Sequence, residues 1–328
     1  MEPIKSAGDI RELANSFRAS RILLTGFELK IFTVLNKHMM TSEEISSKIN
    51  ADPRATDRLL NALCAIGVIK KVKEKFYNTD IAAKYLVEGK PEFIGGLYHT
   101  NHLWDTWSYL TDSVIKGSSY KGEQNKKEKT EWVEAFIAAM HYRGISQGKI
   151  LAMMVDLINV NKILDIGGGS AAFSMELVKK KPSINAVVLD LPHVIPLSKK
   201  YVSNAELTDK FQFIEGNYLK ADFGDSYDLI LLSAVIHINS YEQNKLLIQK
   251  CADALNKSGM IIINDFVMNE DRVHPAHGAL FSINMLVGTA SGDTYTENEI
   301  RKWFEAAGIA HIERKNTSFG SDLMIGIK

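Results

Sequence analysis

The stretch Lys162-Ile-Leu-Asp-Ile-Gly-Gly-Gly-Ser170 decides the fold of this chain. An apolar run ends in an acid and breaks into glycines, and a helical pattern follows over 171–181. This order is typical of a buried parallel strand that leads into a ligand-binding loop. Glycines let a ligand approach the backbone, and the next helix points its positive N-terminus into the same space. The stretch therefore predicts an α/β domain with a nucleotide-type site.

The acid before the glycines distinguishes two kinds of ligand. Gly167-x-Gly169-x-x-Ala172 also fits the dinucleotide fingerprint, and a plain strand-to-helix turn is a further alternative. The carboxylate of Asp165 would repel a pyrophosphate, whereas it would attract the cationic amino and sulfonium groups of S-adenosylmethionine (SAM). We therefore expect SAM rather than a dinucleotide.

Length and composition limit the possible classes of protein. The chain has 328 residues, of which 45% are hydrophobic, so two domains with sizeable cores are expected. Its 39 basic and 39 acidic residues cancel, and a neutral chain has no general attraction for nucleic acid or an anionic membrane. Cys64 and Cys251 lie inside helical patterns, and no apolar run is long enough for a bilayer. We expect a cytoplasmic protein without disulfides.

The N-terminal segment follows the pattern of a winged helix. Apolar stripes predict two helices within 8–37, capping sequences begin two shorter helices, and a hairpin follows over 68–78. A winged helix can read DNA, but the recognition helix offers only Arg54 and Arg58, so it would neutralise few phosphates. A dimerising role is favoured instead, because the apolar stripes exceed what a surface helix needs.

Two helices are expected between the N-terminal segment and the glycine loop. The patterns predict one helix over 91–117 and a long linking helix over 131–157, separated by a polar loop over 118–129. We therefore place a mainly α winged-helix dimerisation domain with a helical extension over 1–117, and a second domain over 118–328.

From residue 162 onward, strand and helix patterns alternate, which predicts a doubly wound, mostly parallel sheet. The expected strands are 163–166, 186–190, 211–214, 229–232, 260–266, 310–315 and 324–327. In such sheets ligands bind beyond the carboxyl ends of the strands, so the residues at those ends are candidates for the site.

Polar side chains follow three successive strands at those ends. Asp190 ends the second strand about 20 residues after the glycines, where an acid takes ribose hydroxyls. Asn217 and Tyr218 follow the third strand and are suited to hold adenine. Ser233 begins the segment after the fourth strand that delivers the imidazole of His237. Any one of them could be structural, but their joint appearance predicts a site.

At this point a resemblance covers almost the whole chain. The matching segments are Glu28-Leu-Lys-Ile-Phe32, Asp52-Pro-Arg54 through Gly67, Leu103-Trp104, Ile163 to Gly169, Leu189-Asp-Leu-Pro192, Gly216-Asn217, Leu232 to His237, and Asn284-Met-Leu-Val287 leading to Thr296-Glu297. The chain resembles the SAM-dependent small-molecule O-methyltransferases of the plant caffeic acid and animal hydroxyindole type. The resemblance implies a winged-helix domain that dimerises and a Rossmann-like class I methyltransferase domain that binds SAM without a metal. It also implies a homodimer.

The resemblance gives roles to individual residues. His237 takes the place of the general base, and Asp265 fits its first acidic partner. The second partner is usually Glu but is Thr294 here, and the Asp or Asn and the Trp that usually follow the base are Ile238 and Asn239. The cofactor-binding set that we predict is Asp165, Gly167, Gly169, Asp190, Leu191, Asn217, Tyr218 and Ser233.

The expected chemistry is methyl transfer to a positioned nucleophile that loses a proton. An imidazole, which titrates near about pH 6.5, can take that proton at neutral pH. The predicted substrate pocket is Trp104, Trp107, Phe136, Met140, Phe281, Asn284 and Met285. Such a lining favours a flat, mostly apolar acceptor, so we predict transfer to a hydroxyl of a small aromatic molecule. Methyl transfer to nitrogen, sulfur or carbon, a non-catalytic SAM-binding protein and a ligand-sensing winged-helix regulator remain alternatives.

Overall fold

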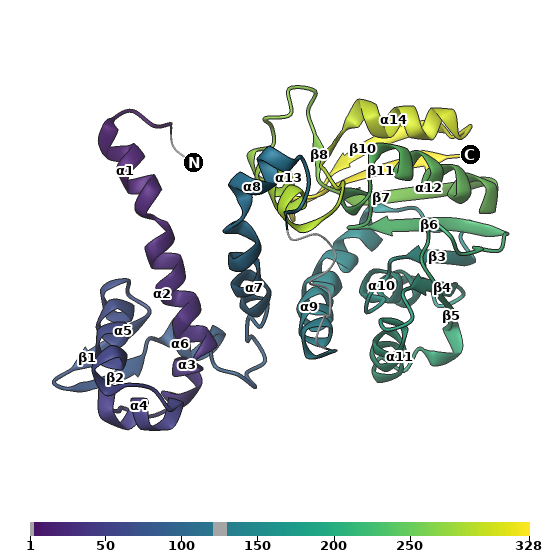
Figure 1. Cartoon of the computed structure of the whole chain (residues 1–328). Helices are drawn as coiled ribbons and strands as arrows, with labels where there is room; N and C mark the ends of the chain where they lie inside the picture. Colours follow the sequence, from purple (N-terminus) through teal and green to yellow (C-terminus); the bar gives the residue numbers. More distant parts are fainter. Residues whose placement is uncertain (1–2, 121–129) are drawn as a thin grey trace. The chain divides into compact units, whose positions relative to one another are not determined.

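The chain folds into two compact units, Met1–Trp104 and Asp105–Lys328. The computed structural model describes residues 3–120 and 130–328 (Figure 1). Part of the predicted polar loop, residues 121–129, lies outside the described residues, and the domain boundary after residue 117 stays a prediction. Among the described helices, none is both long and apolar enough to cross a bilayer.

The first unit is a winged helix built on a small core. Its elements are α1 (Ala7–Asn15), α2 (Phe17–Glu28), α3 (Ile31–Val34), α4 (Ser42–Ile49), α5 (Pro53–Ala65), the antiparallel hairpin β1 (Ile69–Val72) and β2 (Lys75–Asn78), and α6 (Asp80–Tyr85). The Thr41 hydroxyl accepts the Glu44 N–H and the Glu44 carboxylate accepts the Thr41 N–H, so a capping box starts α4. Phe32, Leu60 and Phe76 are fully buried among these elements.

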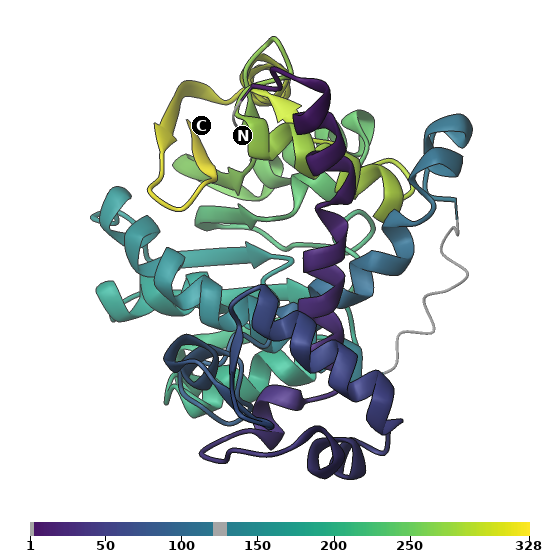
Figure 2. The same ribbon diagram turned by 90° about the vertical axis from the view of Figure 1, so that its left-hand side faces the viewer.

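The apolar residues of the first helix and the start of the second are not packed against the core of this unit. The helix α1 buries none of its residues, and Ile10, Leu13 and Phe17 are 51–57% exposed. Figure 1 and Figure 2 show α1 and α2 following each other as one long, nearly straight rod. An apolar stripe on such a rod is a surface suited to a partner.

The helix predicted over 91–117 is wrong as a single element. The chain forms α7 (Leu97–Trp107) and α8 (Leu110–Lys116) instead. Gly95 and Gly96 precede α7, and glycine disfavours helix because ordering it costs more backbone entropy. The helix α8 ends at Gly117, which adopts the left-handed φ of 78° that favours glycine.

The second unit contains a seven-stranded sheet, and all seven predicted strands are confirmed. Its strands are β3 (Lys162–Ile166), β4 (Asn185–Asp190), β5 (Phe211–Glu215), β6 (Tyr227–Ser233), β7 (Leu255–Asp265), β10 (Ala310–Asn316) and β11 (Asp322–Ile327). They lie in the order β10-β11-β7-β6-β3-β4-β5. The strand β11 is antiparallel to its two neighbours, β10 and β7, whereas β7, β6, β3, β4 and β5 pair in parallel. The strand order reverses between β3 and β6, which is where such sheets bind ligands.

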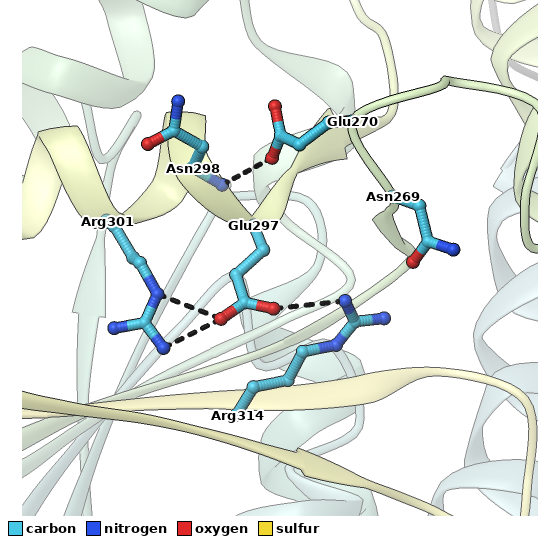
Figure 3. Close-up of a pocket in the computed structure, with 6 residues that line it drawn as sticks. All are labelled: Asn269, Glu270, Glu297, Asn298, Arg301 and Arg314. Carbon is cyan, nitrogen blue, oxygen red and sulfur yellow. Dashed lines mark hydrogen bonds and ion pairs between the residues drawn. The ribbon is translucent and has the colours of Figure 1, made fainter.

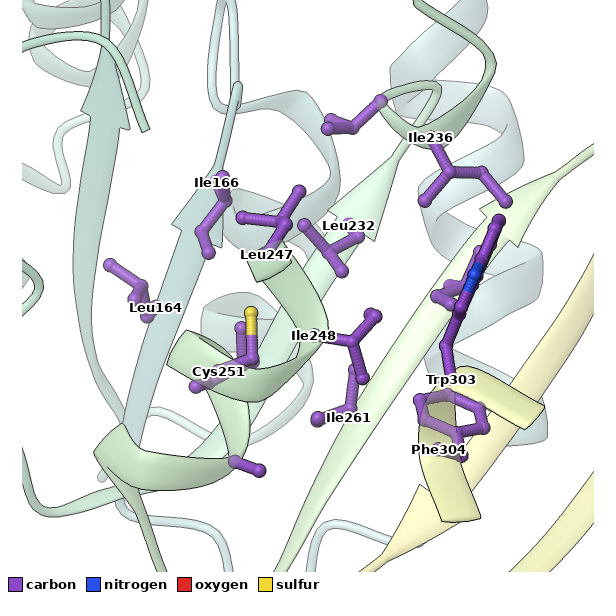
Figure 4. Packing of buried hydrophobic residues seen from close by; sticks show 14 of the residues in the cluster. Leu164, Ile166, Leu232, Ile236, Leu247, Ile248, Cys251, Ile261, Trp303 and Phe304 are labelled. Atoms are coloured by element: carbon purple, nitrogen blue, oxygen red, sulfur yellow. The ribbon is translucent and has the colours of Figure 1, made fainter. Parts of the chain in front are cut away.

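Helices cover both faces of this sheet because its central strands are apolar on both sides. Figure 1 shows α12 (Tyr241–Ala254) and α14 (Glu297–Ala306) on one face, and α9 (Thr130–Met154), α10 (Ala172–Lys180) and α11 (Ile195–Asn204) on the other. Figure 4 shows α12 and α14 packing Cys251 and Trp303 over strand residues such as Ile166. Ile163 faces the opposite cluster.

The long helix α9 is confirmed, and two glycines bring it directly onto α10. A Cβ at Gly144 would lie 2.7 Å from Ala172 Cβ, and one at Gly148 would lie 3.2 Å from Phe173 Cα. Larger residues would push the helices apart, so this spacing fixes α9 beside the glycine loop. The helix ends at Met154, three residues before the predicted end at 157, and Lys180 and Lys181 donate to main-chain carbonyls of the segment that follows.

Candidate active site

The glycine loop after β3 adopts a conformation that its sequence requires. Gly167 and Gly169 have positive φ angles of 65° and 56°, which residues with a Cβ rarely adopt. Gly168 has no room for a side chain, because a Cβ would lie 2.8 Å from Cγ and Oδ2 of Asp165. The three glycines therefore form a close turn over the end of β3.

Asp165 lies beneath this turn and is only 1% exposed. Its Oδ2 accepts a hydrogen bond of 2.5 Å from the Ser174 hydroxyl. Burial raises the pKa of Asp165 to about 6, the hydrogen bond from Ser174 opposes the rise, and nearby Asp190 adds to it. Direct contact between this carboxylate and a cofactor stays a prediction, because the structure places it under the loop rather than on an open surface.

Asp190 joins the end of β4 to the glycine loop. One carboxylate oxygen accepts the N–H of Gly169 at 2.8 Å, and the other accepts the N–H of Leu191 at 2.7 Å. Burial raises the pKa of Asp190, and these two hydrogen bonds oppose the rise. Within residues 3–120 and 130–328, neither Asp165 nor Asp190 forms an ion pair with Lys or Arg. His193 is the basic neighbour that acts on Asp190, and it lowers the pKa of that carboxyl. Two clustered acids without a Lys or Arg partner form a site suited to a cation.

The loop after β5 is held from two sides. Asn217 Oδ1 accepts the N–H of Leu219 at 2.9 Å. Tyr218 donates its hydroxyl to Asn239 Oδ1 at 2.9 Å, and Lys250 donates to the Tyr218 carbonyl at 2.7 Å. The Tyr218 hydroxyl is therefore engaged with the segment after β6.

Two further cofactor candidates lie at the neighbouring strand ends. Leu191 is 40% exposed just beyond β4, where an apolar side chain is available to a ligand. The Ser233 hydroxyl accepts a hydrogen bond of 2.9 Å from Asn264 Nδ2. Their contacts with a cofactor stay predictions.

His237 and Asp265 form a buried pair. His237 lies in the short 3-10 turn Ile236–Ile238 after β6, and Asp265 is the last residue of β7. His237 Nδ1 lies 2.8 Å and 3.0 Å from the two carboxylate oxygens, and Asp265 is 2% exposed. A proton on Nδ1 is then donated to Asp265, which leaves the Nε2 lone pair as the acceptor. This is the arrangement of a carboxylate-oriented general base.

The segment before α14 holds this turn by its backbone rather than by a second acid. The Asp293 N–H donates to the His237 carbonyl at 3.0 Å. A Cβ at Gly292 would lie 2.3 Å from that same carbonyl oxygen, so only glycine fits there. Thr294 is 2% exposed and offers no carboxylate.

Three predicted pocket residues lie on α13 (Ala276–Gly288), and one of them, Phe281, packs against His237. The Phe281 ring stands at 90° to the His237 ring with centroids 5.0 Å apart. Asn284 Oδ1 accepts the indole N–H of Trp107 at 3.0 Å, and Met285 is mostly buried. Phe266, which is not among the predicted pocket residues, packs on Phe281 with the two ring centroids 4.4 Å apart. These rings form an apolar wall next to the imidazole.

Three other predicted pocket residues do not belong to α13. Trp104 belongs to the first compact unit. Phe136 packs against the cluster of Val133, Ile137 and Val194, beside the segment that follows β4. Met140 is 36% exposed on α9. Their roles in a pocket stay predictions.

Sequence reasoning also missed residues that support the loops. Ser174 binds Asp165, Ser198 donates to the Gly169 carbonyl, and His141 Nδ1 lies 3.0 Å from the Ser170 hydroxyl. Burial lowers the pKa of His141. Ser174 and Ser198 sit on helices as ordinary small polar residues, so no motif marked them, and only the fold brings them to the glycine loop.

A separate surface hollow of about 420 Å³ contains charges that pair with one another (Figure 3). Its lining is Asn269, Glu270, Glu297, Asn298, Arg301 and Arg314. Burial would raise the pKa of Glu297, but hydrogen bonds from Arg301 and Arg314 outweigh it and the pKa is lowered. This pairing is typical of a structural network.

Comparison with known proteins identifies the family. Residues 107–310 match the model of the O-methyltransferase domain, which is more than half of the chain. The chain belongs to the O-methyltransferase family. Residues 11–88 match the O-methyltransferase dimerisation domain, which supports a homodimer.

Relatives of this O-methyltransferase match over nearly their whole length. It is 28% identical over 309 residues to the 3-hydroxy-5-methyl-1-naphthoate 3-O-methyltransferase of Streptomyces sahachiroi, covering 92% of this chain and 89% of the relative. It is 26% identical to the acetylserotonin O-methyltransferase of Bos taurus, covering 97% of each. Its fold matches that of human N-acetylserotonin methyltransferase in complex with SAM, with a TM-score of 0.85, 22% identity, and coverage of 100% of this chain and 99% of that one.

The family assignment confirms several predictions. The protein is a SAM-dependent O-methyltransferase with a small-molecule substrate, and its fold is the predicted class I methyltransferase fold. The described part of the chain has no group of three or more His, Cys, Asp or Glu side chains that could hold a metal ion. Metal independence itself stays a prediction.

Proposed function

We propose that this enzyme transfers the methyl group of SAM to a hydroxyl of a small aromatic molecule, with His237 as the general base. The observation that carries this proposal is the His237–Asp265 pair, which stands edge-on to Phe281 at the carboxyl ends of β6 and β7. The names of the two relatives, which state a hydroxynaphthoate and acetylserotonin as their substrates, support an aromatic hydroxyl as the acceptor.

The residues at the ends of β3, β4 and β5 fit SAM as the methyl donor. Bound SAM supplies an electrophilic methyl group on a positively charged sulfur. The clustered carboxylates of Asp165 and Asp190, which have no Lys or Arg partner among the described residues, favour a cationic ligand over a pyrophosphate. Asp190 would hold ribose hydroxyls, and Asn217 and Tyr218 would lie along the adenine. Leu191 would cover its apolar face.

The pair of His237 and Asp265 would remove the proton of the acceptor hydroxyl. Asp265 accepts the Nδ1–H and fixes the tautomer, so Nε2 takes the proton as the oxygen attacks the methyl group. The imidazolium that forms is stabilised by the same carboxylate. Thr294 supplies no second acid, so orientation depends on Asp265 and on the main-chain hydrogen bond from Asp293.

The wall of Phe266, Phe281 and Met285 would bind the aromatic ring of the acceptor. Asn284, whose carbonyl oxygen is held by Trp107, would keep its amide N–H groups for a polar substituent. Such a site selects a flat ring with one or two polar positions.

A screen with methyl-labelled SAM tests this function. Phenols, naphthols, hydroxyindoles, amines and thiols are incubated with the enzyme, and mass spectrometry locates the added methyl group. We expect label on the oxygen of aromatic hydroxyl compounds. Label found only on nitrogen, sulfur or carbon would show that the acceptor is not a hydroxyl and would contradict this proposal.

The exposed stripe of α1 and α2 would form the contact between two copies of the chain. Its residues Ile10, Leu13 and Phe17 are apolar, and the dimerisation match begins at residue 11. Light scattering should give the mass of a dimer, and a monomer at concentrations well above micromolar would contradict this assignment. A cytoplasmic location without nucleic-acid or membrane partners stays part of the proposal.

A further inference from the structure

Asn239, two residues after the base, is joined to three separate segments. Its Oδ1 accepts the Tyr218 hydroxyl at 2.9 Å, and its Nδ2 donates to Asn244 Oδ1 at 3.0 Å. Its main-chain carbonyl accepts the Tyr295 hydroxyl at 2.5 Å. Asn239 is 3% exposed, so these hydrogen bonds are shielded from solvent. In such a low-dielectric environment a hydrogen bond is stronger and fixes the orientation of the side chain.

The three partners are themselves fixed. Asn244 is fully buried on α12 and donates to the carbonyl of Ile236, the first residue of the turn that carries His237. Tyr295 is 4% exposed in β9 (Tyr295–Thr296), and β9 pairs with β8 (Val267–Met268), which begins two residues after Asp265. The network therefore holds both ends of the turn Ile236–Ile238.

The third partner lies on the other side of the switch point. Tyr218 follows Asn217 in the loop after β5, and Lys250 of α12 donates to the Tyr218 and Ala221 carbonyls. The helix α12 thus anchors the loop of the cofactor side and, through Asn244, the turn of the base side. Asn239 is the side chain through which Tyr218 reaches that turn.

A buried amide is costly unless its polar atoms are bonded, so packing alone does not account for it. In the resemblance the residue at this position is usually Trp, which could not accept the tyrosine hydroxyl or donate to Asn244 in this way. The chain therefore has a specific hydrogen-bonded link where an apolar contact would fill the space.

We propose that Asn239 is a positioning residue that ties the His237 turn to the loop after β5, so that a cofactor bound at that loop holds the base in place. The proposal rests on the proposed function, because it gives His237 the role of the base. The link itself can be measured without turnover.

Hydrogen exchange followed by mass spectrometry reads the link directly. S-adenosylhomocysteine, the demethylated product of SAM, is added at saturating concentration and exchange is followed in the peptide that covers residues 234–240. In the wild type we expect bound S-adenosylhomocysteine to slow hydrogen exchange at the turn by roughly fivefold, which corresponds to the free energy of about one net hydrogen bond.

Tyr218→Phe removes only the linking hydroxyl, so in this variant the slowing should disappear. Tyr227→Phe is the matched control, because it removes a buried hydroxyl bonded to the Phe223 carbonyl at the other end of β6. It should keep the slowing.

Asn239→Leu gives a second measurement. It keeps the volume of the side chain and removes its polar atoms, so we expect kcat to fall roughly tenfold while the calorimetric affinity for S-adenosylhomocysteine stays within about threefold. Equal slowing of exchange in the wild type and Tyr218→Phe would overturn the link. Unchanged kcat in Asn239→Leu would overturn the positioning role. If His237→Gln keeps normal turnover, the base assignment fails separately, and the exchange result still decides the link.

Discussion

The two sides of the strand-order reversal are built by different means. On the β3–β4–β5 side, the proposed cofactor site consists of a main-chain turn and carboxylates, and the Asp190 carboxylate accepts the N–H of Gly169 in the glycine loop. On the β6–β7 side, the turn that carries the proposed base His237 is held by contacts between distant segments, such as the hydrogen bond from the Tyr295 hydroxyl to the Asn239 carbonyl. A site that depends on the conformation of the main chain tolerates few substitutions in its motif, whereas a site held by side-chain contacts can be held by different partner residues. The second acid could therefore be lost at Thr294 while the glycine loop kept its sequence.

The sharpest test of this division is loss of the base. His237→Gln should lower turnover by roughly 10²–10⁴-fold, the usual contribution of general acid–base catalysis. Steady-state kinetics on an accepted aromatic alcohol measures it. His274→Gln is the matched control, because His274 Nδ1 also lies 2.8 Å from a carboxylate, that of Asp271, but on the exposed surface. Near-normal turnover of His237→Gln would show that the acceptor ionises without a base.

The buried carboxyl of Asp165, on the proposed cofactor side, should make the free energy of unfolding depend on pH. Asp165 has its pKa raised from 3.8 to about 6 in the fold, so the folded state binds the proton more tightly than the unfolded state. Stability from this group is present below about pH 4 and is lost as pH rises through about 6. Asp165→Asn does not titrate, so its unfolding free energy relative to the wild type should rise by at most about 3 kcal/mol between pH 4 and 7.

Asp228→Asn is the control for that experiment, because its sign is opposite. Burial would raise the pKa of Asp228, but N–H groups of Asn161 and Lys162 and the amide of Asn256 outweigh it, and the pKa is lowered. That carboxylate stabilises the fold above about pH 4 and loses this contribution only at lower pH, so the stability of Asp228→Asn relative to the wild type should fall as the pH rises to about 4 and stay level between about pH 4 and 7. Denaturant unfolding at several pH values measures both, and equal slopes would contradict the account of Asp165.

Loss of Asp190 should weaken binding rather than chemistry. Asp190→Ala removes the acceptor of two main-chain N–H groups and the proposed partner of the ribose hydroxyls, so SAM affinity should fall by about 1.5–3 kcal/mol. Calorimetric titration measures the change, and Asp209→Ala at an exposed position before β5 serves as the control. If SAM affinity is unaltered in Asp190→Ala, the assignment of the cofactor to this side loses its main support.

The smallest effect is expected at the orienting acid. Asp265→Asn keeps the shape of the side chain but removes the charge that stabilises the imidazolium, so turnover should fall by roughly 10- to 100-fold, less than in His237→Gln. The pH–rate profile and kcat of the variant check it. A larger loss than that of His237→Gln would show that the carboxylate has a further role.

Sequence patterns were sufficient for the sheet and for the positions of the glycine turn and the acid at the ends of β3 and β4, because a buried strand, a glycine turn and a terminal acid are local features. The β3 stretch and Asp190 could be identified in this way. The supports of these residues could not, since Ser174, Ser198 and Lys250 are ordinary helix residues until the fold brings them to the loops. The break between α7 and α8 was missed because the apolar pattern continues across it.

The base side shows the limit of motif reasoning more clearly. The resemblance pointed to His237 and Asp265, and the structure brings these two side chains into contact. The resemblance also made Ile238, Asn239 and Thr294 look like losses. Asn239 is instead bonded to Tyr218, Asn244 and Tyr295, and no short motif relates those residues.

The central claim, that cofactor binding and proton removal lie on separate sides of the sheet reversal, is tested most directly by one calorimetric titration. S-adenosylhomocysteine is titrated into His237→Gln. We predict a Kd within about twofold of the wild-type value, because His237 belongs to the β6 side and the loss of its imidazole leaves the glycine loop, Asp165 and Asp190 intact. A Kd weakened by as much as turnover is lowered would contradict the division and make His237 part of the cofactor site.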